Sequence, residues 1–171
     1  IFNTDLSIKN INQEVELYGW ISKKRNLGGM LFIDLRDRSG IIQLVVSPEK
    51  TFFEELSSLK NESVIKIYGK VIERTSKNPN LPTGDIEVEV SSFEVLNESL
   101  DTPFEVNNNT NASEETRLKY RYLDLRREDL SSKFITRHKI CMIARYYLSD
   151  NHFLEVETPI LCKSTPEGAR D

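Results

Sequence analysis

The stretch from Tyr18 to Arg38 constrains the fold more than any other part of the chain. An apolar run leads through the basic triplet Lys23, Lys24 and Arg25 into an Asn-Leu-Gly-Gly corner, after which apolar and polar residues alternate strictly. This pattern predicts two antiparallel strands joined by a cationic hairpin. Neighbouring side chains in a strand point to opposite faces. The face toward the core is therefore predicted to carry Leu31, Ile33 and Leu35, and the other face Phe32, Asp34 and Arg36.

Phe32 thus falls on the polar face of the predicted hairpin, beside the basic triplet. A platform for single-stranded nucleic acid needs an aromatic ring on which a base stacks and cations that meet the phosphates. The alternative is an ordinary Phe that a neighbouring loop covers, since aromatic side chains are largely buried in folded domains. The hairpin alone leaves both interpretations open.

Four further segments complete a predicted barrel after a turn at residues 37–40. Residues 41–46 read as a third strand, and Ser47 and Pro48 favour the start of a helix that closes one end of the barrel. Residues 63–72 and 85–90 read as two more strands, separated by a loop rich in Pro, Asn and Gly. Three strands, one helix and two strands is the order of an all-β OB-fold barrel.

Gln43 in the third predicted strand should face outward with Phe32 if Ile42, Leu44 and Val46 face the core. Its amide offers a donor and an acceptor to a base edge, although most surface glutamines are only solvated. OB-fold barrels bind oligonucleotides across strands two and three and through the loops that flank them. We expect the basic triplet, Phe32, Gln43 and the loop that contains Asn78 to share that surface, which predicts binding of single-stranded RNA or DNA.

Composition restricts the kind of contact that this surface makes. The net charge of −4 argues against a broadly basic nucleic-acid binder, so the contact should be local.

His138 has no second ligand at a metal-binding spacing, and no metal site is predicted. Without a secretion signal or a membrane-spanning run, we expect a cytoplasmic protein with free thiols at Cys141 and Cys162, or an organellar one if a targeting segment precedes Ile1.

The chain changes character after the predicted barrel of residues 1–97. Residues 98–116 contain an Asn-rich run and acidic residues but no Lys or Arg, which is typical of a linker. Ser113 is predicted to cap a basic helix over residues 117–127, and Ser131 or Ser132 a longer helix that ends near Asp150. Residues 153–161 then alternate as a strand as far as Pro159.

These last segments resemble a known family. The long helix followed by Phe-Leu-Glu-Val-Glu-Thr-Pro at residues 153–159 resembles motif 1 of the class II aminoacyl-tRNA synthetases, which forms the dimer interface in that family. The Thr-Pro-Glu-Gly-Ala-Arg-Asp run at 165–171, the basic segment 119–127 and the hairpin are similar to bacterial-type aspartyl-tRNA synthetases. The resemblance implies that residues 117–171 begin an α+β catalytic domain with its first helix and strand. It also implies an N-terminal fragment, because nothing resembles motifs 2 and 3.

The resemblance assigns particular residues to RNA. In similar enzymes the barrel binds the anticodon loop, and the position of Phe32 stacks on the central uracil. The positions of Arg25 and Gln43 bond to anticodon bases, and those of Asn78 and Glu87 lie near the first base. A carboxylate at Glu87 suits guanine there, because the Watson–Crick edge of guanine presents two donors.

The resemblance also implies the chemistry of a complete enzyme, which activates L-aspartate with ATP and Mg²⁺ and transfers it to the 3′ end of tRNA. Glu167 matches a residue that contacts the substrate aspartate, and the expected partner is the ammonium group of that substrate. This chain is expected to bind no ATP or Mg²⁺ itself and contains no assigned catalytic residue, because the cations of motifs 2 and 3 are missing.

Three hypotheses follow from the sequence. The favoured one is the anticodon-binding part of a homodimeric aspartate–tRNA ligase together with the start of its catalytic domain. The second is a stand-alone OB-fold module that binds single-stranded RNA, and the third is a regulatory paralogue that dimerises without catalysis. An enzyme specific for aspartate tRNA and one that also charges asparagine tRNA are both compatible with these residues.

Overall fold

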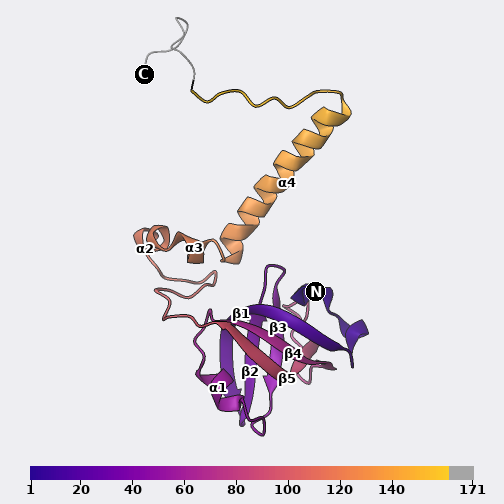
Figure 1. Cartoon of the computed structure of the whole chain (residues 1–171), viewed down its shortest axis with the longest axis vertical. Coiled ribbons are helices and arrows are strands. Elements are labelled where there is room, and N and C mark those ends of the chain that lie inside the picture. The colour runs from indigo at the N-terminus through magenta and orange to yellow at the C-terminus, as the bar shows by residue number, and fades with distance from the viewer. Residues whose placement is uncertain (162–171) are drawn as a thin grey trace, which may run out of the picture. The chain divides into compact units, whose positions relative to one another are not determined.

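The computed structural model describes residues 1–161, shown in Figure 1. The chain divides into two compact units after Glu105. This division falls within the segment 98–116 that the sequence marks as a linker. Each unit has its own secondary structure and is described separately.

The first unit is a closed five-stranded barrel in the order β1-β2-β3-β5-β4 (Figure 1). Neighbouring strands are antiparallel except β3 and β5, which run parallel. One helix lies between β3 and β4 in the chain, as the OB-fold order requires. The strands are β1 Glu14–Leu27, β2 Met30–Arg36, β3 Ile41–Val46, β4 Val64–Glu73 and β5 Ile86–Asn97.

The β1–β2 hairpin forms as predicted. Gly28 and Gly29 both have positive φ, +62° and +86°, which a two-residue hairpin loop of this kind requires. Leu31, Ile33 and Leu35 are buried in the barrel, which confirms the faces assigned to β2. The barrel core combines these side chains with inward residues of the other strands, among them Leu17, Ile42, Leu44, Ile65, Ile67 and Val88.

Two parts of the barrel differ from the sequence prediction. β5 continues to Asn97, well beyond Val90, because it pairs with the whole of β4 across two register shifts, between Tyr68 and Gly69 and between Val64 and Ile65. The helix α1 begins at Phe53 and ends at Ser58, and no side chain caps its N-terminus. Ser47 instead starts a turn, in which its carbonyl accepts from the Lys50 amide at 3.1 Å.

Two short 3₁₀ helices, η1 Asn3–Asp5 and η2 Ile8–Asn10, precede the barrel. Asn3 is fully buried, and its side-chain amide donates to the carbonyl of Leu35 at 3.0 Å. The α1 residues Phe53 and Leu56 join the barrel core, so the helix closes the barrel as expected. The weakly patterned N-terminus is therefore an ordered part of the first unit.

The second unit contains α2 Glu114–Lys119, α3 Arg121–Asp124 and α4 Glu128–Asp150. The Ser113 hydroxyl accepts from the Thr116 amide at 3.2 Å, which confirms the predicted cap. The predicted single helix over 117–127 is instead broken at Tyr120, between α2 and α3.

The long helix α4 begins earlier than predicted. The Arg127 side chain donates to the Asp124 carboxylate at 2.8 Å, and the helix starts directly after it. Ser131 and Ser132 lie inside α4, where their hydroxyls donate to backbone carbonyls one turn earlier. The serines therefore do not cap this helix.

The strand predicted for residues 153–161 is not formed. A strand exists only where its backbone pairs with another strand, and within residues 1–161 this segment has no such partner. Glu155 instead accepts from the Arg145 side chain at 2.9 Å.

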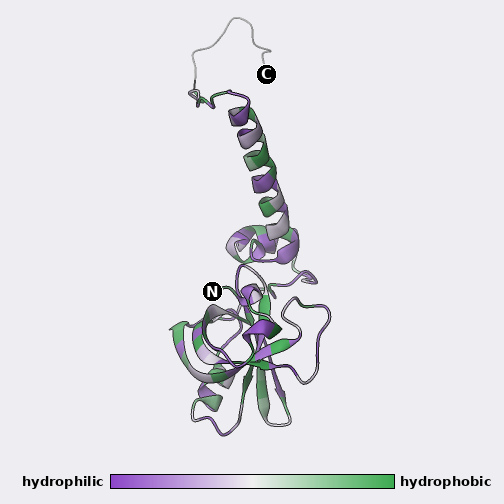
Figure 2. Ribbon diagram, turned by 90° about the vertical axis from the view of Figure 1, so that its right-hand side faces the viewer, coloured by the Kyte–Doolittle hydropathy of each residue, from purple (hydrophilic) through white to green (hydrophobic). Residues whose placement is uncertain are grey.

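Hydrophobic and hydrophilic residues follow one another along α4 (Figure 2). None of the helices in residues 1–161 combines the length and the apolar character that a membrane span requires.

Candidate nucleic-acid interface

Strand register assembles a row of polar side chains on the outer face of the barrel. Asp34 of β2 lies opposite Lys23 of β1 on one side and Gln43 of β3 on the other. Gln43 in turn lies opposite Glu87 of β5. The row Lys23, Asp34, Gln43 and Glu87 therefore crosses four adjacent strands.

A second row lies beside the first and contains the aromatic ring. Phe32 pairs with Arg25 of β1 and Val45 of β3, and Val45 pairs with Glu89 of β5. Phe32 is not part of the barrel core and is half-buried on the outer face. The predicted position of the ring on the polar face is therefore correct, although neighbouring side chains cover part of it.

Hydrogen bonds connect the two rows through Arg25. Its Nη2 donates to Asp34 Oδ1 at 2.6 Å and to Gln43 Oε1 at 3.2 Å. Gln43 Nε2 then donates to Glu87 Oε2 at 2.6 Å. Gln43 and Glu87 are only 5% and 6% exposed, so neither is an ordinary solvated surface residue. Both ends of the Gln43 amide are bonded, which fixes its orientation.

The electrostatics of this face are balanced around Asp34, whose side chain is 19% exposed. Burial raises the pKa of Asp34 above its ordinary value, against the opposing effect of Arg25, Arg74 and Lys23. Three cations therefore surround one carboxylate in a chain whose net charge is negative. The local RNA contact expected from the composition stays a prediction.

The basic triplet does not act as a unit, contrary to the sequence prediction. The register of β1 shifts between Ile21 and Lys23, so that Lys24 pairs with Ile33 of the core-facing set. Lys24 Nζ donates to the Ser57 carbonyl at 2.6 Å and also to the Leu59 carbonyl, at the end of α1. Burial lowers the pKa of Lys24. Lys24 thus connects β1 to the end of α1, and only Lys23 and Arg25 of the triplet lie on the outer face.

Asn78 lies in the loop between β4 and β5 and makes its hydrogen bonds there. Its backbone amide donates to the Gly84 carbonyl at 2.9 Å, and its side-chain oxygen accepts from the backbone amide of Asn80 at 3.1 Å. Thr83 ties the loop to β3 by donating to the Ile41 carbonyl at 2.5 Å. Arg25, Gln43 and Glu87 are therefore joined directly with Phe32 beside them, whereas Asn78 is bonded within its own loop.

Two residues of this face, Asp34 and Arg74, received no function from the sequence. Alternation in β2 already placed Asp34 beside Phe32, so a signal for it was present. Arg74 follows β4 directly, and only the folded barrel brings it near Asp34.

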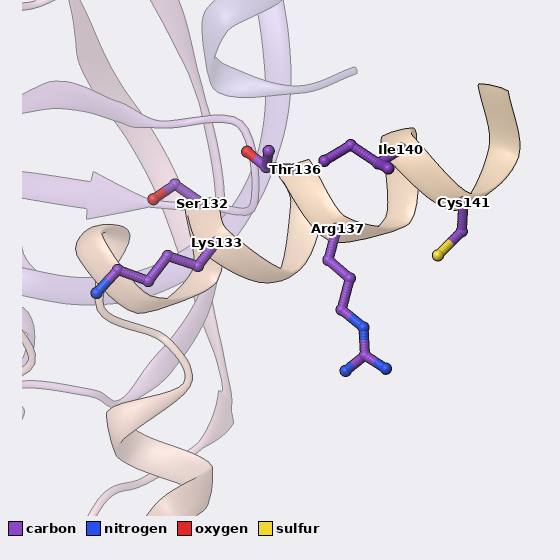
Figure 3. A pocket seen from close by; sticks show the side chains of 6 residues that line it. All are labelled: Ser132, Lys133, Thr136, Arg137, Ile140 and Cys141. Carbon is purple, nitrogen blue, oxygen red and sulfur yellow. The ribbon is translucent and has the colours of Figure 1, made fainter. Parts of the chain in front are cut away.

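The second unit offers no comparable site within its described residues. A shallow hollow on α4 is lined by Ser132, Lys133, Thr136, Arg137, Ile140 and Cys141 (Figure 3). All six residues come from one helix, so the hollow is not enclosed. Glu167, which the resemblance links to aspartate, lies outside the described residues.

Comparison with known proteins shows where these two units belong. Residues 15–96 match the family model of the OB-fold nucleic acid binding domain, and residues 113–171 match that of the class II tRNA synthetases (D, K and N). The aspartate–tRNA ligase of Mesoplasma florum is 53% identical over 166 residues, which make up 97% of this chain and 28% of that protein. This chain is a homologue of the aspartate–tRNA ligases.

Another aspartate–tRNA ligase and a solved structure agree with this relationship. The aspartate–tRNA ligase of Lactobacillus johnsonii is 50% identical over 169 residues, or 98% of this chain and 28% of that protein. The asparaginyl-tRNA synthetase of Pyrococcus horikoshii complexed with asparaginyl-adenylate superposes with a TM-score of 0.85 at 28% identity, covering 98% of this chain and 38% of its own. The chain thus spans 28% of the length of these aspartate–tRNA ligases, and the resemblance found in the sequence is confirmed.

Proposed function

We propose that this chain is the tRNA-recognition part of an aspartate–tRNA ligase and binds the anticodon loop on the outer face of β1, β2, β3 and β5. The observation that carries the proposal is the bonded set Arg25, Gln43 and Glu87 beside the half-buried Phe32. A stand-alone RNA-binding module is not favoured, because residues 113–171 match a class II synthetase model.

In this proposal each side chain has a distinct task. The Phe32 ring stacks on the central base, and Arg25 and Gln43 bond to base edges. The Glu87 carboxylate accepts from the two donors of a guanine at the first position, exchanging its bond to Gln43 for bonds to the base. Asn78 approaches the same base from the loop between β4 and β5.

The complete ligase is proposed to activate L-aspartate with ATP and Mg²⁺ and to transfer it to the 3′ end of tRNA. Glu167 would contact the ammonium group of aspartate. Within residues 1–161, no group of three or more His, Cys, Asp or Glu side chains is arranged to hold a metal ion, so none of them is assigned to Mg²⁺. Charged tRNA is consumed by cytoplasmic protein synthesis, so the cytoplasm is the proposed location.

The proposed binding face is tested by replacing Phe32 with Ala and measuring the affinity for an RNA stem-loop that carries an aspartate anticodon. Losing one base stack should weaken binding by about 1–3 kcal/mol. The matched control is Tyr68→Ala, which removes an exposed aromatic ring from the outer face of β4 and should leave the affinity unchanged. Equal losses in both variants, or none in either, would place the RNA elsewhere.

A further inference from the structure

We propose that Asp34 is a positioning residue of the anticodon-binding face, which holds the Arg25 guanidinium where it reads a base and keeps it off the Phe32 ring. Its effect is on discrimination between anticodons more than on affinity. This inference rests on the proposed function, since it concerns the same face.

The first support is the position of the Arg25 guanidinium. Its partner in the strand register is Phe32, yet its guanidinium bonds to Asp34 and Gln43 in the adjoining row. The charged contact to Asp34 is 2.6 Å, and the contact to the neutral Gln43 oxygen is longer, at 3.2 Å. A carboxylate, which carries the opposite charge, holds a guanidinium more strongly than a neutral amide oxygen does, so Asp34 sets the position of the guanidinium.

The second support is what Arg25 would contact without this carboxylate. A guanidinium next to an aromatic ring is attracted to the face of that ring. The cation–π contacts recorded for residues 1–161 join other pairs, and none joins Arg25 to Phe32. Asp34 therefore draws the guanidinium of Arg25, the register partner of Phe32, away from the stacking surface.

The third support is that a carboxylate is costly at this place. A negative charge on a face that binds RNA repels phosphates and lowers affinity. Burial raises the pKa of Asp34 despite three surrounding cations, so the fold also disfavours its ionised form. Attraction of RNA does not explain an acid here, whereas the placement of Arg25 does.

The same bond also reaches the base-reading groups beyond Arg25. Arg25 Nη2 donates to Gln43 Oε1, which turns Gln43 Nε2 toward Glu87. Asp34 is thus the first of four side chains whose orientations depend on one another. Loss of the first contact should loosen the set that distinguishes one base from another.

The test uses the whole chain and four RNA stem-loops, one with the aspartate anticodon and three with one anticodon base changed. Asp34→Asn keeps the size of the side chain but removes its charge, and it should reduce the ratio of mismatched to matched Kd at least fivefold at one position. Asp34→Glu, which restores the charge, should recover part of that ratio. The control Asp85→Asn removes an exposed carboxylate that faces Lys77, and it should leave the ratio unchanged.

A second measurement does not involve RNA. The Nε–H signal of Arg25 in NMR spectra should report a restrained side chain in the wild type and a mobile one in Asp34→Asn. An unchanged Arg25 signal would overturn the inference, and so would a variant whose Kd values for all four loops shift by the same factor. A wild-type chain that binds the four loops equally would overturn the proposed function, while the Arg25 signal would still decide whether Asp34 positions Arg25.

Discussion

At the scale of single residues, one ion pair joins the hairpin to the turn that precedes β4. Arg36 Nη2 donates to both carboxylate oxygens of Glu62, at 2.8 and 2.7 Å. The side chains of Arg36 and Glu62 are only 13% and 5% exposed, and Arg36 also lies over the Trp20 ring. Because the pair is largely removed from water, each charge depends on the other to offset its desolvation.

Glu62→Ala should therefore lower the free energy of unfolding by about 3–5 kcal/mol, because it leaves the Arg36 charge buried without its main partner. Chemical denaturation of the whole chain measures this change. The control is Lys60→Ala, which breaks an exposed pair with Asp101 and should cost less than about 1 kcal/mol. Similar losses in the two variants would contradict the argument from burial.

Asp34 gives a prediction about pH. Because its pKa is raised in the folded state, the folded chain holds this proton more tightly than the unfolded chain does. The stability that Asp34 contributes is present below its unfolded pKa and is lost as pH rises through the raised folded value. The groups that face it are Lys23 and Arg25 of β1, Arg74 after β4 and the Gln43 amide of β3.

The free energy of unfolding of Asp34→Asn, compared with that of the wild type, should accordingly increase between pH 3 and pH 7. Thermal or urea unfolding at several pH values measures this difference. A difference that decreases over the same range would show that the three cations outweigh burial.

At the scale of elements, the loop between β4 and β5 depends on one glycine. A Cβ at Gly84 would lie 1.7 Å from the carbonyl oxygen of Asn78, so a side chain there forces the loop open. Gly84→Ala should lower the free energy of unfolding by about 1–3 kcal/mol and weaken binding of the anticodon loop. The neighbouring exposed Asp85→Ala should stay within about 0.5 kcal/mol. Denaturant unfolding and RNA titration of both variants measure these effects, and equal losses in the two variants would contradict the prediction.

The strands of the barrel could be located from the sequence because alternation is a local signal, and Leu31, Ile33 and Leu35 show how well it worked. Local signals fail where distant segments decide the outcome. The basic triplet was predicted to share the outer face, but after the bulge Lys24 lies on the side of Ile33, and only Lys23 and Arg25 remain on the outer face. The enclosed bond between Gln43 and Glu87 requires β3 and β5 to meet, and no local pattern encodes their pairing.

At the scale of the whole molecule, α4 presents a face that the other described residues of its own unit, 106–161, do not cover. Ile140, Ile143 and Tyr147 lie on this helix and are 62%, 67% and 67% exposed. Exposed apolar groups gathered on one helix mark an interaction surface. We therefore propose that two copies of the chain associate through α4 and the segment that follows it.

Ile143→Glu should weaken this association at least tenfold, because it places a charge in the proposed apolar contact. Sedimentation equilibrium over a range of chain concentrations measures the change. His138→Glu is a suitable control, since it adds a charge to the exposed opposite side of the same helix. Binding of the RNA stem-loop should be unaffected in both variants, and a wild-type chain that stays monomeric at high concentration would rule out the association.

The bulge after Ile21 decides which side the basic residues of the hairpin face. A regular β1 that kept all its residues would turn every side chain after Ile21 to the opposite side, so that Arg25 would enter the interior and Lys24 would leave the end of α1. Removing the extra residue Ser22 would keep the present sides, because Lys23 would then pair with Asp34 directly after Ile21 pairs with Leu35. Homologues that bind RNA with this face should therefore either keep the bulge or have a β1 that is one residue shorter.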